Sequence, residues 1–547
     1  MSSVANYFHT LRYLRSGQIL GRARFKLFRP RTDERPAPGL RLPRQAYAAP
    51  IRAAQSMLAP DRFRLLNFEA DCAGEADWQG GAKAQLWLYN LHYFDDLNAQ
   101  GASSRTSWHR DLIDRWIDEN PPARGIGWDP YPASRRIVNW IKWSMAGNSP
   151  TPKMRQSLAV QTRWLSRRIE SHLQGNHVFA NAKALVHAGM FFEGGEAQRW
   201  QRRGLQLMRA EIGEQVLADG GHFERSTMYH AGFVEDLLDT IGIMQAYGAA
   251  VDDAWRGTVS RMMDWLEAMS HPDGGIAFFN DAAFGVSPEP AQLRAYAGRL
   301  GVRLNAAKPP GTAGMRRLPA SGYVSIDLPP FFLVCDVAPI GPDHLPAHAH
   351  ADTLSFEMSF EGRRVFVNSG TSEYGSGAER QRQRGTAAHN TLVLDGENSS
   401  EVWAAFRVAR RSRARLLAAS SDSATAKVEG EHDGYRRLRG RNIHRRSWSL
   451  DERELVIEDA VEGGFSDARC YFHVHPEIRV RRSGESTLEL ADSRGALLDV
   501  GFEGAAAVDV VDSTWHPEFG AALKNQCIVA RLEGARMATR IRRSGST

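Results

Sequence analysis

The sequence predicts a multidomain α+β protein in which a helical array precedes an antiparallel β-sandwich. Three observations support this prediction. The 547 residues exceed the roughly 100–200 residues that usually share one hydrophobic core. Apolar residues recur at helical spacing over residues 1–315 and at alternate positions over residues 316–547. A Pro/Gly-rich stretch at 308–322 lies between the two patterns, so we expect the domain boundary near residue 315.

The helical pattern is clearest in one apolar stripe with steps of four, three, four and three residues: Trp255, Val259, Met262, Leu266 and Met269. This spacing is typical of an amphipathic helix packed on its neighbours. Similar stripes occur at 154–169, 205–216 and 234–244, and short loops such as 271–275 separate them. We expect antiparallel helical hairpins layered into a bundle or toroid. No repeat of fixed length is found, which disfavours a regular solenoid.

The strand pattern begins at 353–360, where polar and apolar residues alternate. Glu361 and Gly362 then form a turn, and 363–368 returns as a second strand, which predicts a β-hairpin with one buried face. Residues 446–450 and 454–459 repeat the arrangement around a turn at 451–453. Many short strands with polar turns predict an antiparallel sandwich.

Composition excludes several classes of protein. Hydrophobic residues make up 42% and charged residues 24%, which excludes a mostly disordered or fibrous chain. The four cysteines have no short spacing, which excludes a disulfide scaffold and a zinc knuckle. No apolar run approaches the roughly 20 residues that span a bilayer, and the N-terminus lacks the apolar core of a signal peptide. We therefore expect a protein without an integral membrane segment, and none of these features is an export signal.

The net charge is positive, which favours an anionic partner but does not distinguish between kinds of anionic partner. The formal charge is +6 and the pI is about 9.1, which fits an anionic polysaccharide as well as a nucleic acid. No nucleic-acid-binding motif is found, so we expect no nucleic acid partner. The Arg-rich stretch from Arg12 to Arg31 is a candidate contact for a membrane surface or another protein.

A histidine cluster precedes the strand at 353–360. His348 and His350 are two residues apart on an extended segment, so their side chains point the same way, which suits ligation of a divalent metal. His389, just before the strand-like run 392–394, is a further candidate ligand. The alternative is that these histidines only cap the ends of strands.

Two segments of the helical half are also candidates. Asn176 and His177 follow Gly175 between two helices, although a helix-capping Asn is the competing explanation. Residues 219–230 are dense in hydrogen-bonding groups, and Tyr229 among them can donate or accept a proton if nearby cations lower its pKa. The alternative for Tyr229 is a packing role at a helix end.

Two aromatic segments, 87–95 and 128–136, are candidate substrate walls. They include Trp128, Tyr131 and Arg135. Aromatic faces stack on sugar rings, and an arginine holds a carboxylate or sulfate in a fork. Aromatic residues lie in the core more often than on such a wall, so this pattern alone decides nothing.

Taken together, these motifs resemble the heparinase II/III-like family of polysaccharide lyases. The resemblance is carried in chain order by NLHYFDDL, WDPYPASRR, GNH, ERSTMYH, HAHAD, FVNSGTSEY and RGTAAHNTLVLDG. It implies an incomplete (α/α) toroid followed by an antiparallel β-sandwich, with the active site between them. It also implies β-elimination at a uronic acid, which leaves a 4,5-unsaturated uronate end.

The resemblance implies a role for individual residues. Asn176 matches the residue that hydrogen-bonds the uronate carboxylate, and His177 matches a base or a carboxylate partner. Tyr229 matches the catalytic tyrosine, an acid that for one C5 configuration is also the base, and His348 matches a further catalytic histidine. The expected substrate-binding residues are Trp128, Tyr131, Arg135, His230 and Arg384.

A divalent metal, zinc in most of the family, is implied at His350, Asn368 and His389. The family generally has an Asp in a Val-Asp-x-Gly context where this chain has Val367-Asn368-Ser369-Gly370. A neutral amide is a weaker ligand and leaves the site one negative charge short.

We therefore predict a lyase whose partner is an anionic polysaccharide: a glycosaminoglycan, an alginate or an acidic exopolysaccharide. The chain is also a candidate homo-oligomer. Because the sequence lacks a signal-peptide pattern, we expect this lyase in the cytoplasm or with the machinery that makes or trims a surface polysaccharide. One alternative is a metal-dependent hydrolase, because HAHAD is similar to an HxHxDH signature, although Thr353 stands where that signature has its last His. The other alternative is a non-catalytic polysaccharide-binding or assembly protein.

Overall fold

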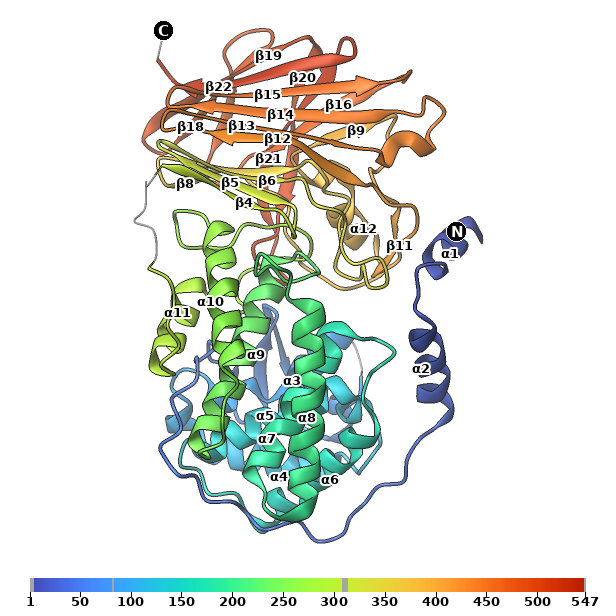
Figure 1. The fold of residues 1–547 in the computed structure, drawn as a ribbon, viewed down its shortest axis with the longest axis vertical. Helices are drawn as coiled ribbons and strands as arrows, with labels where there is room; N and C mark the ends of the chain where they lie inside the picture. Colours follow the sequence, from blue (N-terminus) through green and yellow to red (C-terminus); the bar gives the residue numbers. More distant parts are fainter. Residues whose placement is uncertain (1–3, 81–82, 307–312, 546–547) are drawn as a thin grey trace.

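The computed structural model describes residues 4–80, 83–306 and 313–545. Helices fill the N-terminal region and antiparallel sheets fill the C-terminal region, stacked end to end along the long axis (Figure 1). The predicted fold class, an incomplete helical toroid followed by an antiparallel β-sandwich, is confirmed. The last helix of the first region ends at Arg299 and the next strand begins at Gly314. Residues 307–312, within the stretch predicted to connect the domains, lie outside the described residues.

Eleven of the described helices belong to the N-terminal region. They are α1 (Val4–Leu11), α2 (Ser16–Leu27), α3 (Gln85–Tyr93), α4 (Thr106–Glu119), α5 (Pro130–Met145), α6 (Pro152–Arg167), α7 (Gly175–Phe191), α8 (Gly194–Gln215), α9 (Thr227–Ala246), α10 (Asp253–Ala268) and α11 (Pro290–Arg299). A small antiparallel sheet of β1 (Met57–Ala59), β2 (Arg62–Leu65) and β3 (Phe68–Asp71) precedes α3.

Helix α7 lies at the centre of the helical region. It contacts α5, α6, α8 and α9, and nearly all of its residues are buried. Helix α10 lies further out, and its predicted stripe faces inward: Trp255, Val259, Met262 and Leu266 are buried. Helix α7 is thus apolar and buried on all sides, whereas α10 buries only its apolar stripe.

The C-terminal region contains three larger antiparallel sheets. The five-stranded sheet consists of β4 (Gly314–Leu318), β5 (Tyr323–Leu328), β6 (Phe331–Asp336), β7 (Phe356–Phe360) and β8 (Arg363–Phe366). The eight-stranded sheet has the order β12 (Ala414–Ser421), β13 (Thr425–His432), β14 (Ile443–Asp451), β15 (Glu454–Glu462), β22 (Arg536–Arg543), β19 (Gly495–Glu503), β18 (Thr487–Asp492) and β17 (Arg479–Arg482). The four-stranded sheet has the order β20 (Ala505–Trp515), β21 (Leu523–Leu532), β16 (Ala468–His473) and β9 (Leu392–Leu394). The pair β10 (Val402–Trp403) and β11 (Arg407–Val408) and the helix α12 (Ala378–Arg384) complete the region.

One hydrophobic core fills the space between these sheets. Trp448 and Ile457 come from the eight-stranded sheet, Leu333 and Met358 from the five-stranded sheet, and Ile528 from the four-stranded sheet. The predicted hairpins at 353–368 and 446–459 are both present, as β7–β8 and β14–β15. The sandwich is therefore held by burial of alternate residues on facing sheets.

A loop of the helical region, residues 276–284, joins it to the sandwich; we call it the interdomain segment. The Asn368 amide donates to Phe278 O, at 2.8 Å. Asp281 N donates to His348 O at 2.9 Å, and Thr371 N donates to Ala282 O at 3.1 Å. These hydrogen bonds hold the interdomain segment against the sandwich. They therefore fix how the two domains meet at this point.

Both faces of β7 are buried, although its sequence predicts one buried face. The polar side chains of β7 face the helical region: His271 lies between Ser359, at 2.7 Å, and Glu357, at 2.9 Å. The alternating sequence of β7 predicts that its polar face is exposed to water. In the structure this face is buried against the helical region and hydrogen-bonds to it.

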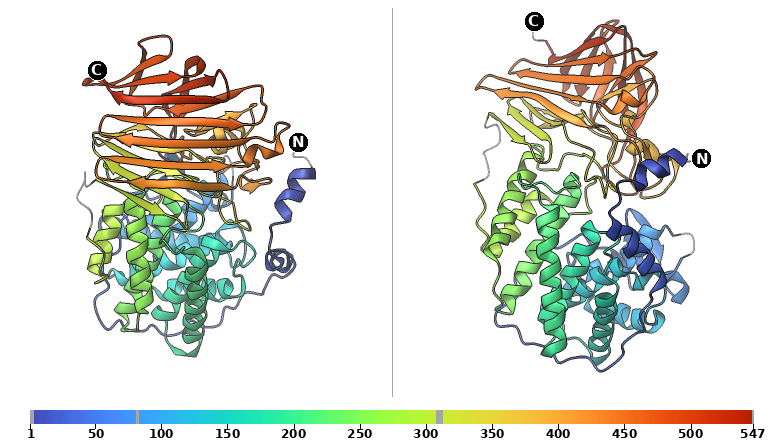
Figure 2. Two further views of the ribbon diagram at one scale, coloured as in Figure 1. Left: turned by 45° about the horizontal axis from the view of Figure 1, so that its top comes forward. Right: turned by 45° about the vertical axis from the view of Figure 1, so that its right-hand side comes forward.

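Helices α1 and α2 lie apart from the helical array, along one side of the molecule (Figures 1 and 2). Helix α1 contacts β11 of the sandwich, and α2 lies against the helical region near His172. Among the described helices, none is long and apolar enough to cross a membrane.

Candidate active site

The first turn of α7 brings Asn176 and His177 to the domain junction. The turn begins at Gly175, whose φ of +55° suits a residue without a Cβ. His177 Nδ1 lies 3.2 Å from Glu170 Oε2, and its ring centroid lies 4.8 Å from that of Tyr131. Burial lowers the pKa of His177, but the Glu170 carboxylate outweighs that effect and the net pKa is raised. His177 therefore lies at the N-terminal end of α7 with an imidazole whose pKa is raised by Glu170.

Tyr229 is held at the first turn of α9. The side chain of Ser226 caps this helix by accepting a hydrogen bond from Tyr229 N at 3.1 Å. The Tyr229 hydroxyl lies 2.9 Å from the Tyr374 hydroxyl, and its ring packs on the His348 ring with centroids 3.9 Å apart. Burial raises the pKa of Tyr229 well above its ordinary value. The neighbouring Tyr374 and Asp281 raise this pKa further, so Tyr229 is a protonated phenol, and the lowering by nearby cations that was considered from the sequence is not found.

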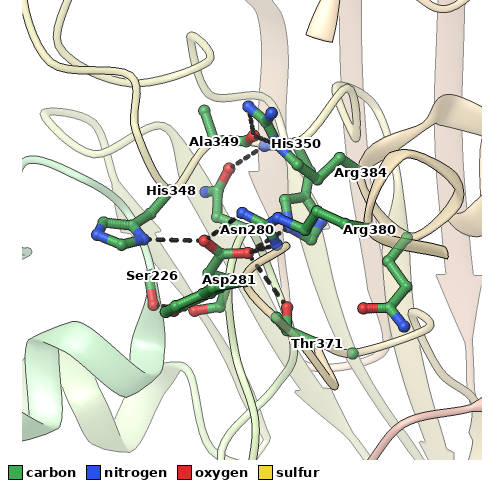
Figure 3. Close-up of polar contacts among 12 residues, drawn as sticks. Ser226, Asn280, Asp281, His348, Ala349, His350, Thr371, Arg380 and Arg384 are labelled. Carbon is green, nitrogen blue, oxygen red and sulfur yellow. Dashed lines mark hydrogen bonds and ion pairs between the residues drawn. The ribbon is translucent and has the colours of Figure 1, made fainter. Parts of the chain in front are cut away.

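His348 is oriented by a carboxylate from the interdomain segment. Its Nδ1 lies 2.9 Å from Asp281 Oδ2 (Figure 3). Its Nε2 faces Glu224 Oε2 at 3.8 Å. A carboxylate at Nδ1 selects the tautomer with the proton on that nitrogen, which leaves Nε2 free to accept a proton. Asp281 of the helical region therefore sets the orientation and the tautomer of His348 in the sandwich.

Asp281 is the centre of this arrangement and is fully buried. Besides His348, it accepts hydrogen bonds from His350 Nε2 at 2.8 Å, from Thr371 Oγ1 at 3.3 Å and from both terminal nitrogens of Arg380 (Figure 3). Burial raises the pKa of Asp281, but Arg380 and the two histidines outweigh it, so the carboxyl stays ionised. His348 and His350 both reach Asp281, His348 at Oδ2 and His350 at Oδ1, but residues 347–348 form a turn and not the extended segment that the sequence predicts.

Glu224 lies between the two domains' candidate groups. An added Cβ on Gly175 would lie 3.1 Å from Glu224 Oε1, while Oε2 faces His348. Both carboxyl oxygens are buried without a hydrogen-bond partner among the described residues. Burial raises the pKa of Glu224, and His348 and His177 oppose part of that shift. The first turn of α7 and the His348 loop therefore meet at a buried carboxyl group.

The implied metal ligands supply only two donors. His350 Nδ1 and His389 Nε2 face each other at 3.3 Å. Asn368, however, donates to Phe278 O at 2.8 Å and accepts from Asn390 N at 3.3 Å, so both ends of its amide are used. Among the described residues, no three His, Cys, Asp or Glu side chains are grouped to hold a metal ion.

The nearby carboxylate does not complete a metal site either. Arg380 is fully buried and already balances the charge of Asp281. Two imidazoles without an anionic ligand do not fit the three protein ligands of a zinc site. The zinc site thus stays a prediction from sequence that this donor set does not support.

The predicted substrate-binding residues fall into two groups. Tyr131 and Arg135 lie on α5 beside the site: Tyr131 is partly exposed against His177, and Arg135 lies between Asp95, at 3.5 Å, and Asp236, at 3.7 Å. Their position suits the predicted role.

The other three expectations need correction, because the structure buries these residues. Trp128 is 4% exposed in the helical core and its Nε1 donates to Asn120 O at 3.1 Å. His230 is fully buried, with Nε2 at 2.9 Å from Met262 O. Arg384 is also fully buried; its Nε and Nη2 donate to Ala349 O at 3.0 and 2.9 Å, so it positions the loop of His348 and His350 from behind.

Four residues that form the site were not identified from the sequence: Glu170, Asp281, Tyr374 and Arg380. Tyr374 closes the FVNSGTSEY motif, so its place in that motif was an available signal. The other three stand alone in segments without a pattern, and only the folded chain brings them to the histidines.

Comparison with known proteins agrees with this architecture. The family model "Heparinase II/III N-terminus" matches residues 97–296, and "Heparinase II/III-like, C-terminal" matches residues 310–544. A heparin-sulfate lyase of Bacteroides stercoris is 26% identical over 468 residues, which are 75% of this chain and 67% of that protein. A heparin-sulfate lyase of Pedobacter heparinus is 26% identical over 315 residues, 52% of this chain and 47% of that protein, so the match spans about half of that relative.

Two further similarities extend over more of the chain. "FtsZ-localized protein C" of Caulobacter vibrioides is 25% identical over 499 residues, 81% of each protein. The solved structure titled "Crystal Structure of Heparinase III" matches with a TM-score of 0.74 at 20% identity, covering 100% of this chain and 93% of that one, which shows the shared fold. The two family models together cover most of both domains, and the chain belongs to the heparinase II/III-like family.

Proposed function

We propose that the protein is a polysaccharide lyase that cleaves a uronic-acid-containing anionic polysaccharide by β-elimination. The observation that carries the proposal is the contact between Tyr229 and His348. A protonated phenol from one domain lies against an imidazole from the other, and Asp281 orients that imidazole with its free nitrogen toward the site. An acid and a base held side by side are what an elimination needs.

The first chemical obstacle is the uronate carboxylate. The proton at C5 is a poor acid, because its removal places more negative charge beside this carboxylate. Asn176 and His177 supply an amide, an imidazole whose pKa is raised and the N-terminal end of α7, all of which stabilise negative charge. We assign these two residues to the carboxylate, and the raised pKa of His177 favours that role over the role of base.

Proton transfer falls to the other two groups. His348 Nε2 accepts the C5 proton, the electron pair forms the C4–C5 double bond, and the bond from C4 to its oxygen breaks. Tyr229 donates a proton to the departing oxygen, for which its raised pKa keeps it ready. Arg135 and Tyr131 extend the contact to neighbouring sugars. No step is assigned to a metal.

The test is the Tyr229→Phe variant, assayed by near-ultraviolet absorbance of unsaturated uronate on a panel of acidic polysaccharides. We expect a loss of roughly 10²- to 10⁴-fold in turnover with an unchanged melting temperature, since only one hydroxyl is removed. Tyr435→Phe is the matched control: its hydroxyl is also buried and donates to Leu392 O at 2.7 Å, but it lies in the sandwich core. Near wild-type turnover in Tyr229→Phe would show that the assigned acid is wrong.

A second candidate function is that of a non-catalytic polysaccharide-binding or assembly protein. The observation behind it is that one relative, similar over 81% of both chains, is named for its location, FtsZ-localized protein C, and not for a lyase activity. Binding of an acidic polysaccharide without any unsaturated product, across the whole panel, would support this candidate over the lyase.

A further inference from the structure

The positive charge of the protein is concentrated at one place. Residues 1–32 contain no Asp or Glu and seven basic residues: Arg12, Arg15, Arg22, Arg24, Lys26, Arg29 and Arg31. Because the whole chain carries +6, the other 515 residues together carry a net charge of −1. We call residues 4–31 the N-terminal arm; it contains α1 and α2, and all seven basic residues are exposed.

Helix α1 turns its polar side to the protein and its apolar side to solvent. Thr10 Oγ1 donates to Val408 O at 3.2 Å and accepts from Trp403 Nε1 at 3.1 Å. Val4, Phe8 and Leu11, which are four and three residues apart, are 86%, 64% and 54% exposed. These three side chains form one stripe on the side away from the sandwich.

Helix α2 has the same inverted arrangement. Gln18 is 6% exposed and donates to His344 O at 3.1 Å, and Gly21 lies against His172. Leu20 and Leu27, one stripe on the opposite side, are 71% and 87% exposed. A helix packed on a core places its residues the other way round.

The exposed apolar side chains of the molecule gather on this arm. Fourteen large hydrophobic side chains are exposed among the described residues, and eight of them lie between Val4 and Phe28. Both helices lie on the same side of the molecule (Figures 1 and 2). The exposed apolar side chains and the excess of basic charge are therefore concentrated in this one segment.

We propose that the N-terminal arm docks the protein on an anionic lipid surface. On a helix that turns about 100° per residue, Ile19, Leu20, Ala23 and Leu27 fall within a sector about 100° wide, flanked by Arg24 on one side and by Arg22 and Lys26 on the other. This is the pattern of a helix that lies in the membrane interface, with leucines among the acyl chains and basic groups at the head groups.

The charges of the arm are available to a partner. Among the described residues, Arg15 is the only one of the seven that pairs with a carboxylate, that of Glu214. An anionic polysaccharide would also attract these groups, but it offers nothing to the exposed leucines. The apolar stripes favour lipid, and the proposal does not depend on the lyase activity.

The experiment is co-sedimentation of the full chain with vesicles of phosphatidylglycerol and phosphatidylcholine, compared with vesicles of phosphatidylcholine alone. We expect the wild-type protein to sediment with the anionic vesicles only. The triple variant Arg22→Gln, Arg24→Gln, Lys26→Gln should lower the partition coefficient about a hundredfold, since each basic group contributes about fivefold. The pair Leu20→Gln, Leu27→Gln should lower it at least tenfold with the charge intact.

A matched control is the triple variant Arg436→Gln, Arg439→Gln, Arg479→Gln, which removes three exposed charges from the sandwich and should retain binding. Circular dichroism should show all variants folded, because every substituted side chain is exposed. Failure of the wild-type protein to sediment with anionic vesicles would overturn the proposal. Retention on immobilised heparin that the arm's charge variant loses, without vesicle binding, would overturn it as well and assign the arm to polysaccharide.

Discussion

Replacing Asp281 by Asn should destabilise the protein strongly and also stop turnover. The carboxylate accepts hydrogen bonds from His348, His350, Thr371 and Arg380. An Asn has nearly the same shape, but its amide nitrogen would face donors instead of accepting from them. The substitution also leaves the guanidinium of Arg380 buried without a counter-charge.

The expected magnitudes follow from burial. Removing one partner of a fully buried ion pair costs about 3–5 kcal/mol of unfolding free energy. Asp273→Asn is the matched control: Asp273 also joins the helical region to the sandwich, through Arg364 Nε at 2.7 Å, but its side chain is 40% exposed. Arg364 is itself buried, but it keeps a second carboxyl group, Glu357 at 3.6 Å, when the partly exposed Asp273 is replaced. Asp273→Asn should therefore cost less stability than Asp281→Asn for the same chemical change.

The two effects of Asp281→Asn are measured separately. Urea unfolding followed by circular dichroism gives the change in stability, and turnover measured well below the melting temperature gives the change in catalysis. Turnover should fall roughly 10²- to 10⁴-fold, because His348 loses the group that fixes its tautomer. If Asp281→Asn matches Asp273→Asn in stability and the wild-type protein in turnover, then Asp281 does not have the role assigned to it.

Three further outcomes are expected. Burial raises the pKa of Glu357 to about 7, so the folded state retains a proton that the unfolded state releases near pH 4.5, and this group makes stability fall as pH rises between those values. Glu357→Gln should remove up to about 1.4 kcal/mol per pH unit from that slope, and equal slopes in urea titrations from about pH 5 to 7 would contradict it. Treatment with a chelator should leave the melting temperature unchanged, because His350 and His389 have no carboxylate to complete a metal site; a marked fall would show that a metal is bound. Gly175→Ala should lower turnover and also cost about 1–2 kcal/mol of stability, since Gly175 has a φ of +55° and an added Cβ would lie 2.7 Å from Leu345 and displace the first turn of α7. Unchanged kinetics, measured well below the melting temperature, would show that this turn does not position the substrate.

The fold was predictable because its periodicities are strong. In β14 and β15 the alternate residues Trp448, Leu450, Leu455 and Ile457 are all buried, as the hairpin pattern requires. What alternation could not show is a polar face that becomes buried against another domain. Glu357 on β7 is such a case, because its partners belong to the helical region.

The site was predictable only in part. Tyr229 and His348 stand in dense motifs and do meet in the structure. Asp281 could not be found, because it lies 67 residues before His348 and 99 before Arg380, in a segment with no motif. Trp128 was predicted to contact substrate but lies in the helical core. A mixed run of aromatic and polar residues does not show which of its side chains are buried and which face a site.

The interdomain segment has one further consequence. The loop that carries Asp281 is also the loop whose backbone is hydrogen-bonded to His348 and Thr371. A movement that separates this loop from the sandwich would break those backbone hydrogen bonds and, at the same time, withdraw the carboxylate from the imidazole. In the mechanism that we propose, closure of the two domains and the orientation of the proton acceptor are therefore coupled.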